Sequence, residues 1–309
     1  MQSPRPPSPK LPRGQVDPVV ENEGEEKRMQ VGIHSAFHAG SVDLAQFAAR
    51  CEALGFESLW LPEHSVIPVH PSVGPGGVPG APIPDSYVLM VDPLIGLTVA
   101  ATVTQTLRLG TGVCLIPQHH PVDLAKRIAS LDLYSKGRFI LGTGTGWQPE
   151  ESAALGGDFP HRWVQTAEAL TIMHKLWTEP EPEHAGTYYR FPPIRFHPQP
   201  VQRPRPPILL GGTTPKVFQR AAALADGWAP WMIAAEGLAA GRHHLRREFE
   251  KAGRDPGTAQ VTAFVSSSDT DVVEQYQAAG ADRLVFTMGS SPAADPFGRL
   301  ETLAQAAGL

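Results

Sequence analysis

Short apolar runs alternate with longer amphipathic stretches along the chain from Met29 onward. Runs typical of strands begin near eight positions, at Gln30, Ser58, Arg108, Arg138, Pro207, Gly227, Gln260 and Asp282. Stretches with helical periodicity lie between them, at residues 42–54, 121–134, 163–177 and 214–225. This alternation predicts parallel strands joined by right-handed crossovers. Eight such units in about 250 residues predict an α/β fold of the (β/α)8 TIM-barrel class.

A doubly wound sheet is the rival fold, because the same alternation of strands and helices would produce it. The stretch from Gly142 to Trp147 resembles the Gly-x-Gly-x-x-Gly turn of dinucleotide-binding sheets only in part. Trp147 stands where the last glycine of that motif belongs. The missing glycine disfavours the rival fold.

Two connections are too long for plain barrel loops, which predicts loop insertions after strands 2 and 4. Residues 65–91 are rich in glycine and proline, and they follow the second strand. Residues 178–206 are rich in proline and contain several aromatic and basic side chains. We expect both to lie at the carboxyl ends of the strands, the first as a lid, where barrels build their specificity.

The first 28 residues differ in composition from the rest of the chain. Six prolines precede the charged run of residues 21–28, and almost nothing in the segment could be buried. This composition predicts a disordered tail at 1–28 and one catalytic barrel domain at 29–309. The tail lacks the apolar core of a secretory signal, and Met29 is a plausible alternative start.

Composition excludes several classes of function. The formal net charge of −5 and the lack of a long basic run argue against a nucleic-acid binder. No apolar run reaches the roughly 20 residues that span a bilayer. The two cysteines, Cys51 and Cys114, cannot form a disulfide framework, which fits a reducing cytoplasm.

Glycine and threonine alternate at the end of the fourth predicted strand, in residues 142–147. Glycine lets a ligand approach the backbone closely, and threonine adds a hydroxyl group. Three other predicted strands end in small or polar residues, at 62–64, 110–113 and 211–212. Carboxyl ends of barrel strands meet at one mouth, so these segments predict a site there.

The pair Glu63–His64 ends the second strand. His64 could hydrogen-bond a cofactor or move a proton, with the neighbouring carboxylate of Glu63 orienting it. A pair that caps a helix or packs a loop is the alternative. Placement at a strand end favours the functional interpretation.

The third strand ends at Gly112–Val113, where the backbone could bulge against a flat ring. The next residue, Cys114, has no neighbour in sequence that would lower its pKa, which favours a buried structural thiol over a nucleophile.

The turn Gly211–Gly212–Thr213 joins the fifth strand to a helix start and is a candidate phosphate site. An ordinary strand-to-helix turn is the alternative. Thr214 is expected to cap that helix, with Pro215 in its first turn.

A metal site is not expected. The spacing His34-x-x-x-His38 is not the His-x-His of barrel metallohydrolases, and no clustered Cys/His motif is present in the sequence.

Several motifs in order resemble the luciferase-like monooxygenase superfamily and, within it, the actinobacterial deazaflavin (coenzyme F-420) dependent oxidoreductases. They lie at residues 54–64, 92–94, 107–113, 137–147, 206–212 and 225–228. The resemblance implies a barrel that holds a flavin-type ring in its mouth. It places Glu63 and His64 beside the ring, and Gly112–Val113, often joined by a cis peptide bond, behind it. The other implied cofactor contacts are Gly144, Thr145, Gly146 and Trp147 at the ring edge, and Gly211, Gly212 and Thr213 at the tail phosphate.

The chain departs from the sugar-phosphate dehydrogenases of this superfamily at two positions. Trp147 stands where those enzymes have a catalytic glutamate, and Pro68 stands where they have a tryptophan. Sugar-phosphate oxidation is therefore not expected. His64 remains the candidate for proton transfer.

The resemblance implies a cytoplasmic oxidoreductase that transfers hydride between reduced coenzyme F-420 and a small organic substrate such as an activated alkene or carbonyl compound. An FMN-dependent two-component monooxygenase, supplied by a separate cofactor reductase, is the alternative. A catalytically silent ligand-binding barrel is a further one. The family also implies a homodimer.

Overall fold

A parallel β-barrel forms the centre of the protein in the computed structural model, which describes residues 29–266, 269, 271–288 and 295–309. Within these ranges, eight strands pair side by side in chain order, and pairing of β11 with β1 closes the ring. They are β1 (Gln30–His34), β2 (Ser58–Leu61), β3 (Arg108–Thr111), β5 (Phe139–Gly144), β8 (Ile208–Leu210), β9 (Gly227–Trp228), β10 (Gln260–Val265) and β11 (Arg283–Thr287). The predicted barrel is confirmed. The predicted tail at 1–28 lies outside the described residues.

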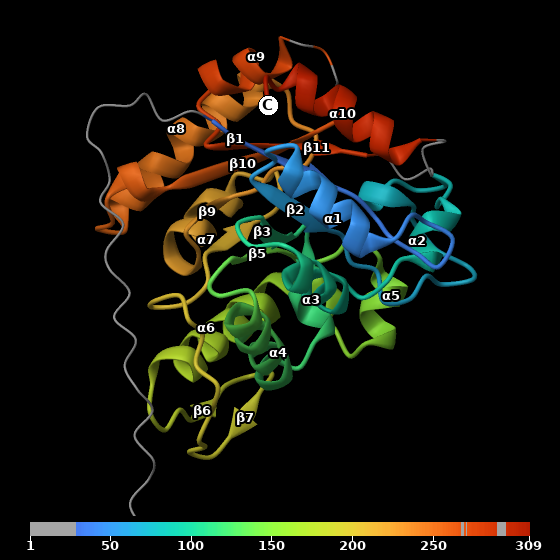
Figure 1. Cartoon of the computed structure of the whole chain (residues 1–309). Coiled ribbons are helices and arrows are strands. Elements are labelled where there is room, and N and C mark those ends of the chain that lie inside the picture. The colour runs from blue at the N-terminus through green and yellow to red at the C-terminus, as the bar shows by residue number, and fades with distance from the viewer. Residues whose placement is uncertain (1–28, 267–268, 270, 289–294) are drawn as a thin grey trace, which may run out of the picture.

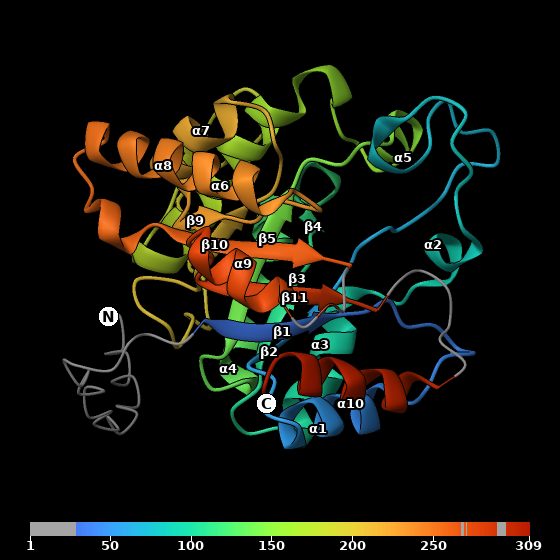
Figure 2. The same cartoon turned by 90° about the horizontal axis from the view of Figure 1, so that it is seen from above.

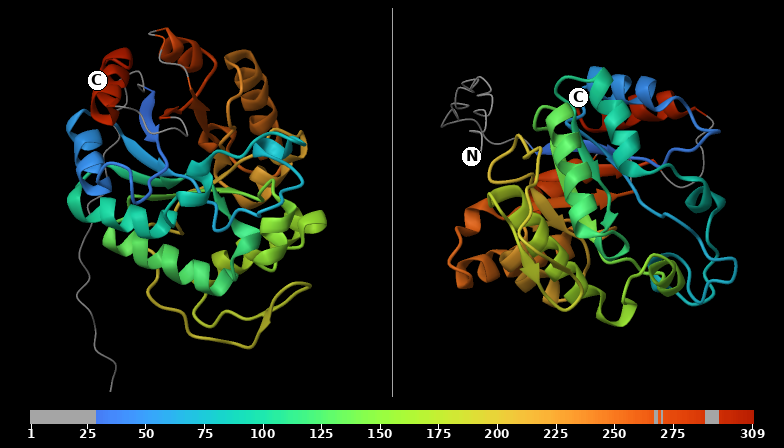
Figure 3. Two further views of the ribbon diagram at one scale, coloured as in Figure 1. Left: turned by 90° about the vertical axis from the view of Figure 1, so that its right-hand side faces the viewer. Right: turned by 90° about the horizontal axis from the view of Figure 1, so that it is seen from below.

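Helices surround the barrel on its outer side, as Figure 1 and the two views of Figure 3 show. They are α1 (Leu44–Ala53), α3 (Pro93–Val103), α4 (Pro121–Tyr134), α6 (Arg162–Thr178), α7 (Lys216–Leu224), α8 (Ala235–Lys251), α9 (Val272–Ala278) and α10 (Pro296–Ala306). Shorter elements are α2 (Asp85–Leu89), α5 (Pro149–Ala154), and the 3-10 turns η1 (Pro75–Gly77), η2 (Ile116–Gln118), η3 (Phe159–His161) and η4 (Pro256–Thr258).

Side-chain caps fix where some of these helices begin. The Asp43 carboxylate accepts a hydrogen bond from Gln46 N (2.8 Å) at α1, and Asp92 accepts one from Ile95 N (2.9 Å) at α3. The predicted cap at Thr214 is wrong, since Pro215 holds the N-cap position of α7. A residue before proline is disfavoured in the helical region, so the helix begins after this pair.

A separate apolar cluster fills the inside of the barrel, made of Trp60, Ile140, Leu209, Ala229, Phe264 and Val285. Trp60 is fully buried, and its indole Nε1 donates to Ser58 Oγ at 2.8 Å. A Cβ atom built on Gly110 would lie 2.2 Å from the Trp60 ring. Glycine at this position of β3 therefore makes the space that the indole occupies.

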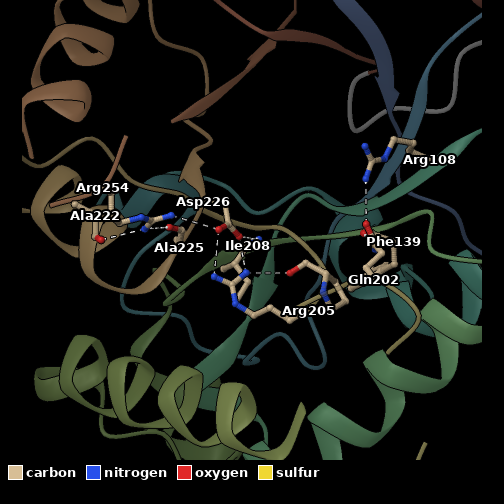
Figure 4. Close-up of polar contacts among 10 residues, drawn as sticks. Arg108, Phe139, Gln202, Arg205, Ile208, Ala222, Ala225, Asp226 and Arg254 are labelled. Atoms are coloured by element: carbon tan, nitrogen blue, oxygen red, sulfur yellow. Dashed lines mark hydrogen bonds and ion pairs between the residues drawn. The ribbon is translucent and has the colours of Figure 1, made fainter. Parts of the chain in front are cut away.

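Ion pairs and hydrogen bonds connect the amino ends of the strands (Figure 4). Asp226, just before β9, accepts from Arg205 Nη2 (3.2 Å) and from Ile208 N (2.8 Å). Arg254 lies on the other side of the same carboxylate, with Nη2 at 3.5 Å. In TIM barrels this end serves stability, and the carboxyl ends of the strands carry the chemistry.

The insertion at residues 65–91 lies beyond the carboxyl ends of the strands, where Figure 2 shows α2 and α5 together past the strand arrowheads. Gln148 Nε2 donates to Val73 O (3.0 Å), and Ser72 N donates to Glu150 Oε1 (3.2 Å). These bonds attach the insertion to the segment that follows β5. We call residues 65–91 the lid, and its predicted position is confirmed.

The second insertion, residues 178–206, is not placed as we expected. It leaves the carboxyl end of α6 and returns to the amino end of β8, so its two ends lie at the opposite side of the barrel from the lid. Gln202 Nε2 donates to Phe139 O (2.7 Å), at the start of β5. A hairpin inside it, β6 (His184–Ala185) and β7 (Arg190–Phe191), lies along α6. Helix α6 runs from the mouth back toward the amino ends of the strands. A segment that follows this helix therefore begins at the amino ends and not at the mouth.

Candidate active site at the mouth of the barrel

A bulge interrupts the third strand at the mouth, between β3 and the short β4 (Cys114–Leu115). The peptide bond between Gly112 and Val113 is cis, as the resemblance implied. Gly112 N donates to Leu61 O (2.7 Å), and His34 Nε2 donates to Gly112 O (3.1 Å). Thr143 Oγ1 donates to Cys114 O (3.1 Å), and Leu115 N donates to Glu63 Oε2 (2.5 Å). Neighbouring strands thus hold this segment from several sides.

Glycines surround the side chain of Val113, which is partly exposed in the mouth. A Cβ atom built on Gly144 would lie 2.9 Å from Val113 Cγ2, and one built on Gly211 would lie 3.7 Å from Val113 Cγ1. A Cβ atom on Gly112 would lie 2.9 Å from the His34 ring. The structure therefore brings Gly112, Val113, Gly144 and Gly211 together, and it adds His34, which the sequence analysis considered only as a metal ligand.

Burial disfavours the charged form of His34 and lowers its pKa to about 4, although the hydrogen bond to Gly112 O acts in the opposite direction. The imidazole is therefore neutral at pH 7. A carbonyl oxygen only accepts, so the ring proton resides on Nε2. His34 acts as a neutral support for the bulge.

A buried carboxylate on α5 binds the imidazole of His64. His64 Nδ1 lies 2.9 Å from Glu151 Oε2, and Glu151 Oε1 accepts a hydrogen bond from Ser65 N at 3.0 Å. With the carboxylate as acceptor, His64 donates from Nδ1, so Nε2 is the ring nitrogen that this contact leaves open to other partners. Aromatic rings enclose this imidazole, with centroids of Tyr87 at 5.0 Å and Trp147 at 5.1 Å.

Glu151 and Tyr87 were missed by the sequence analysis. Glu151 lies in the first turn of a short helix, where an acidic residue commonly stabilises the helix N-terminus, so it gave no distinct signal. Tyr87 lies in the lid, far from any predicted strand.

Glu63 does not orient His64, which corrects our interpretation of the pair. Its two carboxylate oxygens accept from Leu115 N (2.5 Å) and His119 Nε2 (2.9 Å). Consecutive residues of an extended chain point to opposite sides, so Glu63 faces the back of the bulge while His64 faces the lid. Burial and the Glu63 charge raise the pKa of the Cys114 thiol, which agrees with a structural cysteine.

The remaining ring-edge candidates follow β5. Thr145 is buried, whereas Gly146, with a φ of 76°, and Trp147 are partly exposed. A Cβ atom built on Gly146 would lie 3.6 Å from Gln118 Nε2. The amide of Gln118 is buried, and among the described residues neither its nitrogen nor its oxygen has a hydrogen-bond partner. Such a group suits a polar ligand edge, and the sequence analysis missed it.

Two arginines lie close to the predicted phosphate turn. Gly211 is buried, while Gly212, with a φ of 113°, and Thr213 are exposed just before α7. A Cβ atom built on Gly212 would lie 3.8 Å from the Trp163 ring, and the Arg220 guanidinium covers that ring at 4.3 Å. Burial and the charge of Arg162 lower the pKa of Arg220, which indicates two neighbouring cations. Cations and free N–H groups of a helix start favour an anion here.

The lid contains an apolar cavity of about 350 Å³. Its lining consists of Ile67, Pro68, Val69, Pro71, Val73, Gly80, Ala81, Pro82, Ile83 and Val88. Val88 follows Tyr87 in α2, so one short helix supplies both a residue of the cavity lining and a ring that lies against His64. In the described part of the chain, helices fall short of the length and apolar character that crossing a membrane requires.

A protein-family model described as luciferase-like monooxygenase matches residues 29–306. An uncharacterized protein of Mycobacterium tuberculosis is 34% identical over 266 residues, which cover 84% of this chain and 92% of the relative. A protein of the same organism named F420-dependent hydroxymycolic acid dehydrogenase is 28% identical over 259 residues, which cover 82% of this chain and 66% of that protein.

Among solved structures, the monooxygenase RslO1 from Streptomyces bottropensis superposes with a TM-score of 0.71 at 21% identity. The match covers 91% of this chain and 97% of that structure. At this identity the likeness concerns the fold, and it agrees with the closed barrel described above.

Proposed function

Because the chain belongs to the luciferase-like monooxygenase family, we propose that it is an oxidoreductase that works on a small organic substrate with a flavin-type ring held at the barrel mouth. The observation that carries this proposal is the bulge at Val113. Glycines at 144 and 211 leave its face uncovered, and a Cβ atom at Gly144 would press on it at 2.9 Å. A flat ring needs a rigid, uncovered support of this kind.

The residues around the bulge fit the parts of such a cofactor. Val113 and Gly112 would support the ring, and the unpartnered amide of Gln118 would meet its polar edge with Thr145, Gly146 and Trp147. The exposed turn Gly211–Gly212–Thr213 at the start of α7 would hold the anionic tail, with Arg220 as a counter-charge.

The bound ring would supply hydride or activated oxygen, while the protein supplies orientation, exclusion of water and proton transfer. His64 would carry the proton on Nε2, because Glu151 holds Nδ1 at 2.9 Å and stabilises the imidazolium when it forms. Tyr87 and Trp147 cover the imidazole and keep bulk water from it.

Coenzyme F-420 is the cofactor that we propose first, with FMN as the alternative. A relative named F420-dependent hydroxymycolic acid dehydrogenase supports the first, and the monooxygenase family supports the second. With F-420 the reaction is hydride transfer to or from the substrate. With FMN it is monooxygenation, which needs a separate cofactor reductase.

The apolar lining of the lid cavity supports a substrate with an apolar portion, attached to the activated alkene or carbonyl group that reacts near His64. Homodimer formation and a cytoplasmic location are parts of the same proposal.

Fluorescence titration of the purified protein with each cofactor tests the proposal. We expect saturable binding of F-420 and weaker binding of FMN. Tight FMN binding without F-420 binding would assign the monooxygenase alternative. Failure to bind either ring would leave a catalytically silent barrel.

A further inference from the structure

A chain of polar contacts connects the surface helix α4 with the back of the bulge. Arg127 Nη2 lies 3.1 Å from His119 Nδ1, and His119 Nε2 lies 2.9 Å from Glu63 Oε1. Glu63 Oε2 then accepts from Leu115 N at 2.5 Å. The side chains of Glu63 and His119 are 4% and 9% exposed, so the central contact is shielded from water.

The chemistry of the donors decides the direction of each bond. A guanidinium has only donors, so Arg127 donates and His119 Nδ1 accepts. The proton of the neutral imidazole then resides on Nε2, which donates to Glu63. Burial alone would raise the pKa of Glu63, but its hydrogen bonds from His119 and Leu115 N hold it below the ordinary value. Glu63 is therefore a buried carboxylate held by these two donors, with the Cys114 thiol as a further hydrogen-bond partner.

Glu63, His119 and Cys114 also offer ligand atoms within 4.8 Å of one another, which raises the question of a metal ion. A histidine that binds a metal usually donates its other N–H to an acceptor. Here the other nitrogen accepts from a cation, Arg127. A metal ion would also have to displace the Nε2 proton and add positive charge beside the guanidinium. The contacts therefore favour a hydrogen-bonded chain over a metal site.

We infer that Glu63 is a positioning residue that holds the Gly112–Leu115 segment in place through Leu115 N, and that Arg127 and His119 hold Glu63. The ring-support role of this segment rests on the proposed function. Without Glu63 the Leu115 N–H would lose a charged acceptor, and the bulge would gain freedom at its Leu115 end. Glu63 thus acts on the cofactor through the backbone and does not transfer a proton.

The variant Glu63→Gln tests this inference because it keeps the shape of the side chain. A carboxamide has one acceptor oxygen, so either Leu115 N–H or His119 Nε2–H must face an NH2 group. We expect hydrogen exchange at residues 112–115 of the cofactor-free protein to become at least about tenfold faster. We also expect the dissociation constant of the ring that binds wild type to rise by at least about tenfold, which corresponds to about 1.4 kcal/mol.

Glu57→Gln is the matched control. Glu57 is another carboxylate bound to a cation, Arg283, at 2.7 Å, but it precedes β2 and lies at the opposite end of the barrel. We expect this variant to lower Tm without changing hydrogen exchange at 112–115 or the affinity for the ring.

Arg127→Met and the double variant with Glu63→Gln test the outer part of the chain. If the residues act as one unit, the double variant will weaken binding by less than the product of the two single effects. Asp123→Asn is the control here, since Asp123 pairs with Arg127 at 2.8 Å on the surface and is 65% exposed. If the two single effects on the dissociation constant multiply in the double variant, Arg127 does not act through Glu63, and the part of the inference that concerns Arg127 is overturned.

The outcomes separate this inference from the proposed function. If wild type binds a ring and Glu63→Gln binds it equally with unchanged exchange, the inference is overturned and the proposed function stands. If wild type binds neither ring, the proposed function fails, and hydrogen exchange alone decides whether Glu63 anchors the segment. Stabilisation of the cofactor-free protein by Zn²⁺ that disappears in Cys114→Ser would identify a metal site and overturn the inference.

Discussion

His64 Nδ1 and Glu151 Oε2 lie 2.9 Å apart, although 87 positions separate the two residues in the sequence. The pair joins the end of β2 to α5 across the barrel mouth, and the same carboxylate also accepts from Ser65 N. The Glu151 side chain is fully buried, so these protein donors take the place of water around its carboxylate. This arrangement fixes the orientation of the His64 imidazole, as the proposed proton transfer requires.

Glu151→Gln will lower turnover by about a hundredfold, because His64 loses the carboxylate that fixes its tautomer and stabilises its protonated form. The affinity for the ring will change little. Steady-state turnover and fluorescence titration of the variant measure the two quantities. Adding His64→Ala will cause little further loss if the two groups act as a unit. Full turnover in Glu151→Gln would contradict proton transfer by this pair.

His34→Gln will make the free energy of unfolding less dependent on pH in the acid range. His34 has a pKa of about 4 in the folded protein and an ordinary value of 6.5, so the unfolded chain binds more protons between these values. The contribution of neutral His34 to the free energy of unfolding is fully present above pH 6.5. It decreases by about 3 kcal/mol as the pH falls toward 4. Urea unfolding of both proteins at several pH values measures the difference. Parallel curves for wild type and variant would refute the assignment.

Alanine at two glycines of β5 will have different effects. At Gly144 the new Cβ meets a side-chain atom, Val113 Cγ2 at 2.9 Å, so we expect near-normal Tm and weaker cofactor binding. At Gly142 it would lie 2.1 Å from the backbone oxygen of Thr111, which cannot move alone, so we expect a loss of about 1–3 kcal/mol or more in stability. Thermal unfolding and fluorescence titration distinguish them. Unchanged ring affinity in Gly144→Ala would argue against Val113 as the support.

Asp226→Ala will lower the stability of the barrel without affecting the mouth. The carboxylate accepts from Arg205 and from Ile208 N, and Figure 4 shows it between Arg205 and Arg254. Removing the acceptor leaves a partly buried guanidinium unpaired, at a cost of about 2 kcal/mol. Denaturant unfolding measures the loss. A parallel loss of cofactor affinity would show that the two ends of the barrel are coupled.

Local patterns predicted the strands because each barrel strand is a short apolar run between helical stretches. Each of the eight predicted starts falls at the first residue of a barrel strand or one residue before it. Helix α4 spans Pro121–Tyr134 as predicted. Both ends have local signals, because proline favours the first turn of a helix and Gly137 follows shortly after the last turn.

The sequence by itself therefore determined the barrel, the mouth as the place of the candidate site, and the glycines that the structure places around Val113. Only the tertiary structure decided which side chains meet there. Glu151 and Arg127 carry no sequence signal, because the histidines that they contact, His64 and His119, lie outside their own helices and the distances depend on how the closed sheet aligns them. Gln118 carries none either, because only the packing of the fold buries its amide without a partner among the described residues. The direction of Glu63 was also decided by the fold, since the alternation of an extended chain separates two adjacent residues that the sequence presents as a pair.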